Sequence, residues 1–226
     1  SAVALAEAAR FDPVADFVPI GLFTETSSVL WAHAELGVRD VDQFLARARD
    51  GRRERLAFGT TGSGSVSEQA VEQIARHFGL DLTKVPYRGT APQLTDLVAG
   101  HVQIGAADYA TAASHHRDGR LLPLLVLGRR RLDELPDVPA TAEIGIAEPD
   151  FTLWNGMFAP AATPQPVVAR LTAALQMALA TGTVRAVTAS NGNRAFFEGG
   201  EGARSRLARE LAERRAFARE IGAIAS

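Results

Sequence analysis

The sequence contains no cysteine and a single lysine, and each scarcity excludes a class of chemistry. Without cysteine, these 226 residues can form no disulfide, thiol nucleophile, thiolate metal site or iron–sulfur cluster. Lys84 is the single lysine, so Schiff-base chemistry is excluded at every other position. A net charge of −2 provides no basic face that favours nucleic acid. No apolar run approaches the roughly 18 residues that a membrane helix needs.

The rest of the composition is that of a globular protein. Hydrophobic residues make up 46% of the sequence and charged residues 22%, which excludes a disordered or fibrous chain. A chain of 226 residues can form one large domain or two small ones. The first residues lack the charged start and long apolar core of a signal peptide, so we expect any export signal to lie outside this sequence.

Short β-rich runs alternate with helical patterns along the sequence. Strands are predicted at 17–23, 28–33, 56–59, 84–87, 101–108, 121–127, 151–160 and 195–197. Helices are predicted at about 40–50, 67–78, 92–99, 110–118, 183–190 and 203–221, with a further helix capped by Thr163. This alternation favours βαβ units, a largely parallel sheet and an α/β fold class. Residues 129–150 are charged and proline-rich, which is typical of an irregular surface segment.

The loop at 60–65, TTGSGS, is the most informative candidate site. Gly62 and Gly64 permit positive φ and a close approach of the backbone to a ligand. Free N–H groups at the start of the following helix favour a bound anion. Four hydroxyls add donors, those of Thr60, Thr61, Ser63 and Ser65. Because the loop contains no basic residue, it suits a carboxylate better than a triphosphate, although a tight turn without a ligand explains the same residues.

Other glycine-loop functions fail at named positions. A Walker A loop needs lysine after Gly64, where Ser65 stands, and a dinucleotide fingerprint needs a third glycine, where Ser67 stands. The loop also lacks the glycine spacing of a nucleophile elbow. We find no recognisable arrangement of nucleophile and base, so we predict no catalytic residue, and a hydrolase or transferase is the least favoured function. A flavodoxin-like protein that holds an FMN phosphate in this loop is the alternative function.

Asp108 ends a predicted buried strand and is the second candidate. In open α/β sheets the carboxyl edge is where ligands bind, so Asp108 could accept a hydrogen bond from a ligand hydroxyl or amine. An N-cap for the helix that follows is an equally good interpretation. The five histidines are scattered and show no metal-binding spacing, so we predict neither a metal nor a cofactor.

Five phrases taken together resemble one family. They are FDPVADFVPIG at 11–21, FGTTGSGS at 58–65, VPYRGTAPQLTDLVAGHVQ at 85–103, LPDVPATAEIG at 135–145 and LWNGMFAPAATPQPVVARL at 153–171. In this order and spacing they are similar to the periplasmic substrate-binding receptors of tripartite tricarboxylate transporters, also called Bug receptors.

The resemblance implies a two-lobed, Venus-flytrap α/β protein of the periplasmic binding protein class. Such a receptor is periplasmic, is not an enzyme, holds a small carboxylate or related metabolite in a cleft between its lobes, and delivers it to membrane transporter subunits. The terminal lobe would comprise 1–27 and 154–226, and the central lobe 28–153.

The resemblance also assigns roles to single residues. The glycine loop would hold a ligand carboxylate through Thr60, Thr61, Gly62, Gly64 and Ser65. Asp108 corresponds to an acidic residue that faces the cleft. The loop after the strand at 84–87 would place three more residues at the same rim, Arg88, Gly89 and Thr90.

The sequence departs from the family pattern at two places. Glu68 stands where family members often have a histidine, and an acid there is unhelpful to a carboxylate unless it points away or meets a cationic ligand. The segment that usually precedes the FDPV phrase is absent, so we expect the terminal lobe to lack strands. The sheet edge exposed in this way invites pairing with another chain, including a homodimer.

Overall fold

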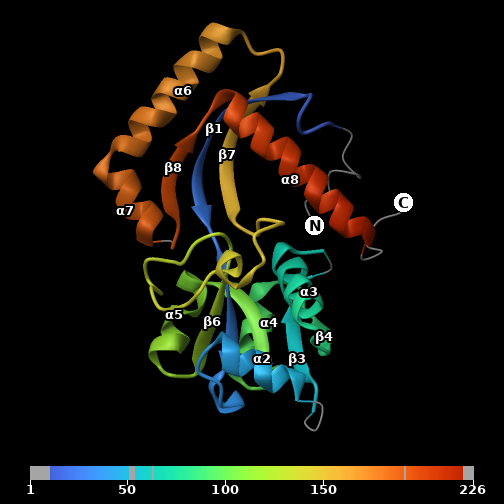
Figure 1. The fold of residues 1–226 in the computed structure, drawn as a ribbon. Helices are drawn as coiled ribbons and strands as arrows, with labels where there is room; N and C mark the ends of the chain where they lie inside the picture. Colours follow the sequence, from blue (N-terminus) through green and yellow to red (C-terminus); the bar gives the residue numbers. More distant parts are fainter. Residues whose placement is uncertain (1–10, 51–53, 63, 191, 221–226) are drawn as a thin grey trace. The chain divides into compact units, whose positions relative to one another are not determined.

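The computed structural model describes residues 11–50, 54–62, 64–190 and 192–220 (Figure 1). Within them the chain divides into two compact units. The first unit runs from Ser27 to Thr152. The second combines the described residues that precede Ser27 with those that follow Thr152.

A five-stranded sheet forms the centre of the first unit, in the order β4-β3-β5-β2-β6. The strands are β2 (Ser28–His33), β3 (Leu56–Thr60), β4 (Leu82–Pro86), β5 (Ile104–Asp108) and β6 (Leu121–Leu127). β3 is parallel to β4 and β5, whereas β2 is antiparallel to β5 and β6. Four strands therefore run in one direction, and the predicted largely parallel sheet is confirmed in this unit.

Helices cover both faces of this sheet, as expected for buried strands. They are α2 (Val41–Arg49), α3 (Val66–Phe78), α4 (Thr90–Val98) and α5 (Tyr109–Arg117). On one face Phe44 of α2 and Ile74 of α3 pack with Leu30 of the sheet. On the other face Leu97 of α4 and Ala112 of α5 pack with Trp31, which is fully buried.

Local sequence signals explain the ends of α2 and α3. Asp40 caps α2, since its Oδ1 accepts from the Gln43 N–H at 2.8 Å, as the Asp40–Gln43 spacing predicts. Ser65 caps α3 in the same way, with its Oγ accepting from the Glu68 N–H at 3.2 Å. Gly79 ends α3 with a φ of +65°, a conformation that favours glycine.

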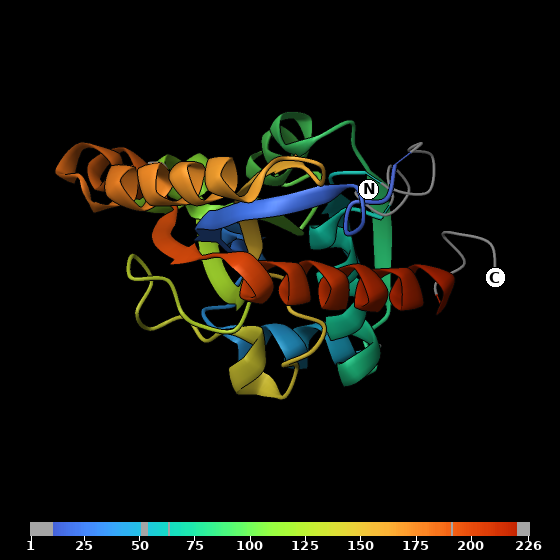
Figure 2. The same cartoon turned by 90° about the horizontal axis from the view of Figure 1, so that it is seen from above.

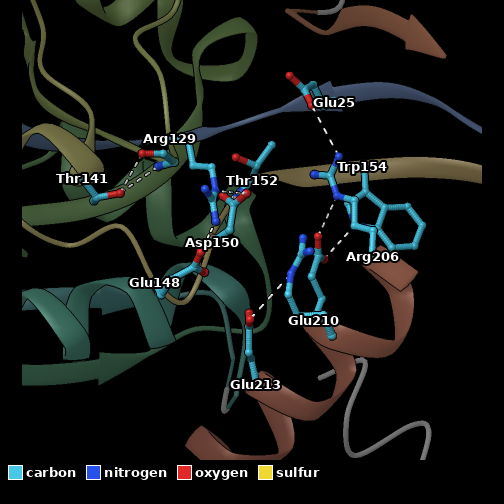
Figure 3. A network of polar contacts seen from close by, with 12 residues as sticks. Glu25, Arg129, Thr141, Glu148, Asp150, Thr152, Trp154, Arg206, Glu210 and Glu213 are labelled. Atoms are coloured by element: carbon cyan, nitrogen blue, oxygen red, sulfur yellow. Dashed lines mark hydrogen bonds and ion pairs between the residues drawn. The ribbon is translucent and has the colours of Figure 1, made fainter. Parts of the chain in front are cut away.

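The segment after β6 is irregular, as predicted, and is held by polar contacts. It contains one short 3₁₀ helix, Thr141–Ile144, and a second 3₁₀ helix, Ala34–Leu36, follows β2. The Thr141 Oγ1 accepts from the Gly128 N–H at 3.1 Å and donates to the Gly128 carbonyl at 2.8 Å. Arg129 forms ion pairs with Glu148 and with Asp150, the latter at 3.1 Å (Figure 3).

The second unit contains a three-stranded sheet in the order β7-β1-β8. Its strands are β1 (Phe17–Thr26), β7 (Leu153–Pro160) and β8 (Arg194–Glu198), and its helices are α6 (Gln165–Ala180), α7 (Gly182–Ser190) and α8 (Gly200–Glu220). β1 is antiparallel to both neighbours, so the parallel arrangement predicted from the alternation does not extend to this unit. Figure 2 shows β1 between α6 and α8.

Only part of the apolar surface of α6 is buried. Val168 and Leu175 pack with Ile20 of β1, but Leu171, which has the same helical spacing, is 40% exposed. The helix begins at Gln165 with Pro164 as its N-cap, so the predicted cap at Thr163 is one residue too early. Among the described residues no individual helix has the length and apolarity of a membrane span, and α6 with α7 meets that criterion only as a pair bent by 73°.

A buried polar network joins β7 to α8 (Figure 3). Glu210 is 5% exposed, and its Oε2 accepts from the Trp154 indole N–H at 2.8 Å. Its Oε1 accepts from Arg206 Nε at 2.8 Å. Arg206 also lies 3.5 Å from a carboxylate oxygen of Glu198 and 3.8 Å from one of Glu25. The buried charge of Glu210 is therefore paired, as buried charges must be.

Glu210→Leu should destabilise the second unit, because it leaves the Trp154 N–H and the Arg206 guanidinium without their shared acceptor. We expect a loss of about 3–5 kcal/mol in the free energy of unfolding, measured by urea titration. Glu201→Gln, on the exposed side of α8, is the control and should change it by less than about 0.5 kcal/mol. Equal stability of the two variants would show that the network contributes nothing.

Candidate functional site

One edge of the five-stranded sheet gathers the predicted site residues. β3, β4 and β5 are parallel, so their carboxyl ends, Thr60, Pro86 and Asp108, lie along the same edge. The loop after β3 is the glycine loop, and the loop after β4 carries residues 88–90. The topology therefore brings together three segments that are far apart in the sequence, at the edge where open α/β sheets bind ligands.

The glycine loop has the backbone that its sequence predicts. Gly62 and Gly64 have φ values of +126° and +72°, which favour glycine over any residue with a Cβ. Ser65 ends the loop as the N-cap of α3. Ser63, which was also a candidate, lies outside the described residues.

Most donors of this loop are used within the protein. The Gly64 N–H donates to Glu68 Oε2 at 2.5 Å, and the Gly64 carbonyl accepts from Gln69 Nε2 at 3.2 Å. Thr61 Oγ1 and Ser67 Oγ share a hydrogen bond at 3.1 Å. The first turn of α3 thus fixes the shape of the loop, and the roles of Glu68 and Gln69 were not foreseen from the sequence.

The structure shows in which direction the Glu68 side chain points. Its side chain is buried, and its Oε1 lies 2.9 Å from Lys84 Nζ. Lys84 Nζ also donates to Glu72 Oε1 at 2.5 Å. The hydrogen bond to Glu72 raises the pKa of Lys84 most, and the hydrogen bond to Glu68 raises it further. Glu68 therefore points into the protein and has a cationic partner. The one lysine of the chain is thus shared by the buried Glu68 and by Glu72.

Unlike the glycine loop, the loop after β4 keeps donors that have no partner among the described residues. Gly89 is the N-cap of α4, and having no side chain it cannot cap the amides of the first turn, which begins at Thr90. Arg88 is exposed, and no ion pair involves it within the described part of the chain. A helix N-terminus and a guanidinium at one rim favour an anion.

Tyr87 holds this loop against the far end of α4. Its hydroxyl donates to Asp96 Oδ2 at 2.7 Å, and His101 Nδ1 lies 3.3 Å from the other oxygen of Asp96. Desolvation, followed by the bond to Asp96, raises the pKa of Tyr87 to about 12. The hydrogen bonds from Tyr87 and then His101 lower the pKa of Asp96. Tyr87 therefore remains a donor throughout the neutral range.

Asp108 is the N-cap residue of α5, yet its side chain does not cap a backbone N–H. Its Oδ2 accepts from Thr111 Oγ1 at 2.8 Å. Its Oδ1 is buried and has no hydrogen-bond partner among the described residues. An unpaired buried acceptor costs about 1–3 kcal/mol, so this oxygen marks a place where a donor from outside the chain would be stabilising.

Gln93 is a buried polar residue that sequence reasoning missed. It is fully buried on the first turn of α4, and neither amide atom has a partner among the described residues. It packs over Gly59 and Gly105, which are register partners in β3 and β5. The available signal was a glycine inside each of two predicted strands, since strand glycines often mark a close approach.

Gly105→Ala tests this packing, because its Cβ would overlap Gln93 Nε2. We expect the free energy of unfolding to fall by about 1–3 kcal/mol in urea titration, as for overpacked cores. The double variant Gln93→Ala with Gly105→Ala should recover part of that loss, whereas Gly182→Ala, which meets open space, should change little. A Gly105→Ala protein as stable as wild type would contradict the close contact.

The sequence model of the tripartite tricarboxylate transporter family receptor, TctC, matches residues 5–222. The chain belongs to the TctC family. The predicted resemblance is therefore confirmed. The chain spans about half the length of the curated relatives it matches, 49% for each of the first two.

Solved structures confirm the α/β fold of periplasmic binding proteins for this TctC-family chain. A TctC solute-binding protein from Polaromonas has a TM-score of 0.81 at 22% identity, covering 96% of this chain and 74% of that one. Rpa4515 of R. palustris, solved with adipate, gives 0.77 at 25% identity, covering 94% and 71%. MatC of Rhodopseudomonas palustris, solved with malate, gives 0.68 at 30% identity, covering 94% and 72%.

Proposed function

We propose that this chain is a periplasmic receptor that binds a small carboxylate without converting it and presents it to a tripartite tricarboxylate-type transporter. Membership of the receptor family supports this function. Two relatives at 25% and 30% identity were solved with dicarboxylates, adipate and malate. The proposed ligand site is the sheet edge formed by the ends of β3, β4 and β5.

The observation that carries the proposal is the unpartnered Oδ1 of Asp108. A carboxylate oxygen accepts and cannot donate, so its partner must be a donor group of the ligand or a water that the ligand holds. A carboxylate ligand with a hydroxyl or amine substituent provides such a donor. Asp108 therefore favours substituted acids, such as malate, over unsubstituted acids of the same length.

Arg88, Gly89 and Thr90 are the groups proposed to hold the ligand carboxylate. Arg88 supplies a charge with two parallel N–H donors, and the uncapped amides of α4 supply neutral donors beside it. Thr61, Gly62 and Ser65 would line the neighbouring part of the rim with polar, uncharged groups, whereas the predicted Thr60 is only 1% exposed. In this arrangement the charge of the ligand is met at α4, and its substituent is met by Asp108.

The flavodoxin-like alternative receives no support from the loop geometry. A flavin phosphate would need the amides that follow β3, and the Gly64 N–H is already bonded to Glu68. Glu68 would also repel a phosphate dianion at that position. An FMN titration followed by flavin absorbance tests this alternative directly.

Asp108→Ala should remove the preference for a hydroxylated acid. We expect it to weaken malate binding by about 10- to 100-fold, the value of a hydrogen bond to a charged group, and to leave succinate binding nearly unchanged. Isothermal calorimetry on the whole chain measures both ligands. Thr111→Val removes only the partner of Oδ2 and should keep the preference.

Arg88→Gln should weaken malate and succinate to the same extent, because both carry the carboxylate that Arg88 is proposed to meet. A folded protein that binds no member of a panel of mono- and dicarboxylates would contradict the receptor function. Equal malate affinity in wild type and Asp108→Ala would contradict only the role of Asp108.

A further inference from the structure

The carboxylate of Glu68 lies where the sequence predicts a bound anion. It lies at the first turn of α3, behind a strand and a glycine loop, where unpaired amides and the helix dipole favour negative charge. Its Oε2 takes the Gly64 N–H and its Oε1 takes Lys84 Nζ. Both oxygens of the buried group are therefore bonded inside the protein.

The atoms around Glu68 form a complete carboxylate site. Gly64 is buried and is held at its N–H by Glu68 and at its carbonyl by Gln69, which is also buried. Lys84 supplies the positive charge and is kept in place by Glu72 on the next turn of α3. A backbone amide, an ammonium group and a helix N-terminus are the donors by which a protein would bind a free carboxylate.

We propose that Glu68 is an internal occupant of this carboxylate site and that it sets the charge selectivity of the receptor. With Glu68 present, two acids, Glu68 and Glu72, share one lysine behind the glycine loop, so this end of the rim repels a second carboxylate. The preferred ligand class is then a hydroxy- or amino-substituted monocarboxylate, whose charged end lies at Arg88 and α4. The statement about the ligand rests on the proposed function, whereas the statement about the internal site does not.

The internal site can be tested without knowing the ligand. Glu68→Ala deletes the part of the side chain that acetate reproduces, so acetate should bind between the Gly64 N–H and Lys84 Nζ. We expect acetate to return the Gly64 amide resonance toward its wild-type position in ¹⁵N-resolved NMR spectra and to raise the melting temperature of this variant. Wild type should show neither change, because its site is already filled.

Two matched variants separate this effect from general destabilisation. Glu72→Ala removes an acid that bonds the same lysine but does not touch Gly64, so acetate should not shift its Gly64 resonance. Glu68→Gln keeps an acceptor oxygen in the site and should also be insensitive to acetate. An acetate response equal in wild type and Glu68→Ala, or a folded Glu68→Ala protein without one, would overturn the internal site.

Ligand selectivity is the second measurement. Malate and 2-hydroxybutyrate share a hydroxyl and a four-carbon chain and differ by one carboxylate. Emptying the site in Glu68→Ala should shift the ratio of their dissociation constants toward malate by about tenfold, relative to wild type and to Glu72→Ala. An unchanged ratio would overturn the selectivity role. Binding of neither acid, alongside a clear acetate response, would contradict the proposed function and leave the internal site standing.

Discussion

The ion pair between Glu68 and Lys84 is the contact on which the arrangement of the candidate site depends. It joins the first turn of α3 to β4, and through the Gly64 N–H it also fixes the loop that follows β3. A buried carboxylate is stable only when a cation and further hydrogen bonds compensate for its lost hydration. One lysine thereby allows a buried negative charge beside a loop of glycines and hydroxyls.

The strand ends along this sheet edge therefore differ in which of their polar groups are already bonded. At the end of β3, most of the donors that the structure describes bond within the protein. At the ends of β4 and β5, groups are left without protein partners, namely the guanidinium of Arg88 and one oxygen of Asp108, as far as the described residues show. The ends of β4 and β5 would therefore bind the ligand, and the end of β3 would support this edge of the site.

Patterns that act over a few residues were predictable, and contacts between distant segments were not. The Asp40–Gln43 cap, the stop at Gly79 and the positive φ of Gly62 follow from local chemistry that any neighbouring fold would preserve. The antiparallel pairing of β1 with β7 and β8 joins segments more than a hundred residues apart, which periodicity cannot reveal. The strand glycine Gly105 signals a close approach without naming Gln93 as its neighbour.

The direction in which a side chain points was also not predictable from the sequence. Glu68 is compatible with a charge facing the rim or a charge facing inward, and only the position of Lys84 on the adjacent strand decides between them. Leu171 similarly has the spacing of a core residue, although it is 40% exposed in the structure. In each case the neighbour that determines the environment comes from another element.

The two tryptophans provide one optical reporter for each unit. Trp31 is wholly enclosed in the first unit and donates its indole N–H to the Ala107 carbonyl at 3.0 Å, an environment that gives blue-shifted emission. Trp154 belongs to the second unit, is partly exposed, and bonds a carboxylate, which shifts emission to the red. Replacing either one by phenylalanine would leave a single emitter, so that the melting of each unit becomes visible by itself in the fluorescence of an unlabelled protein.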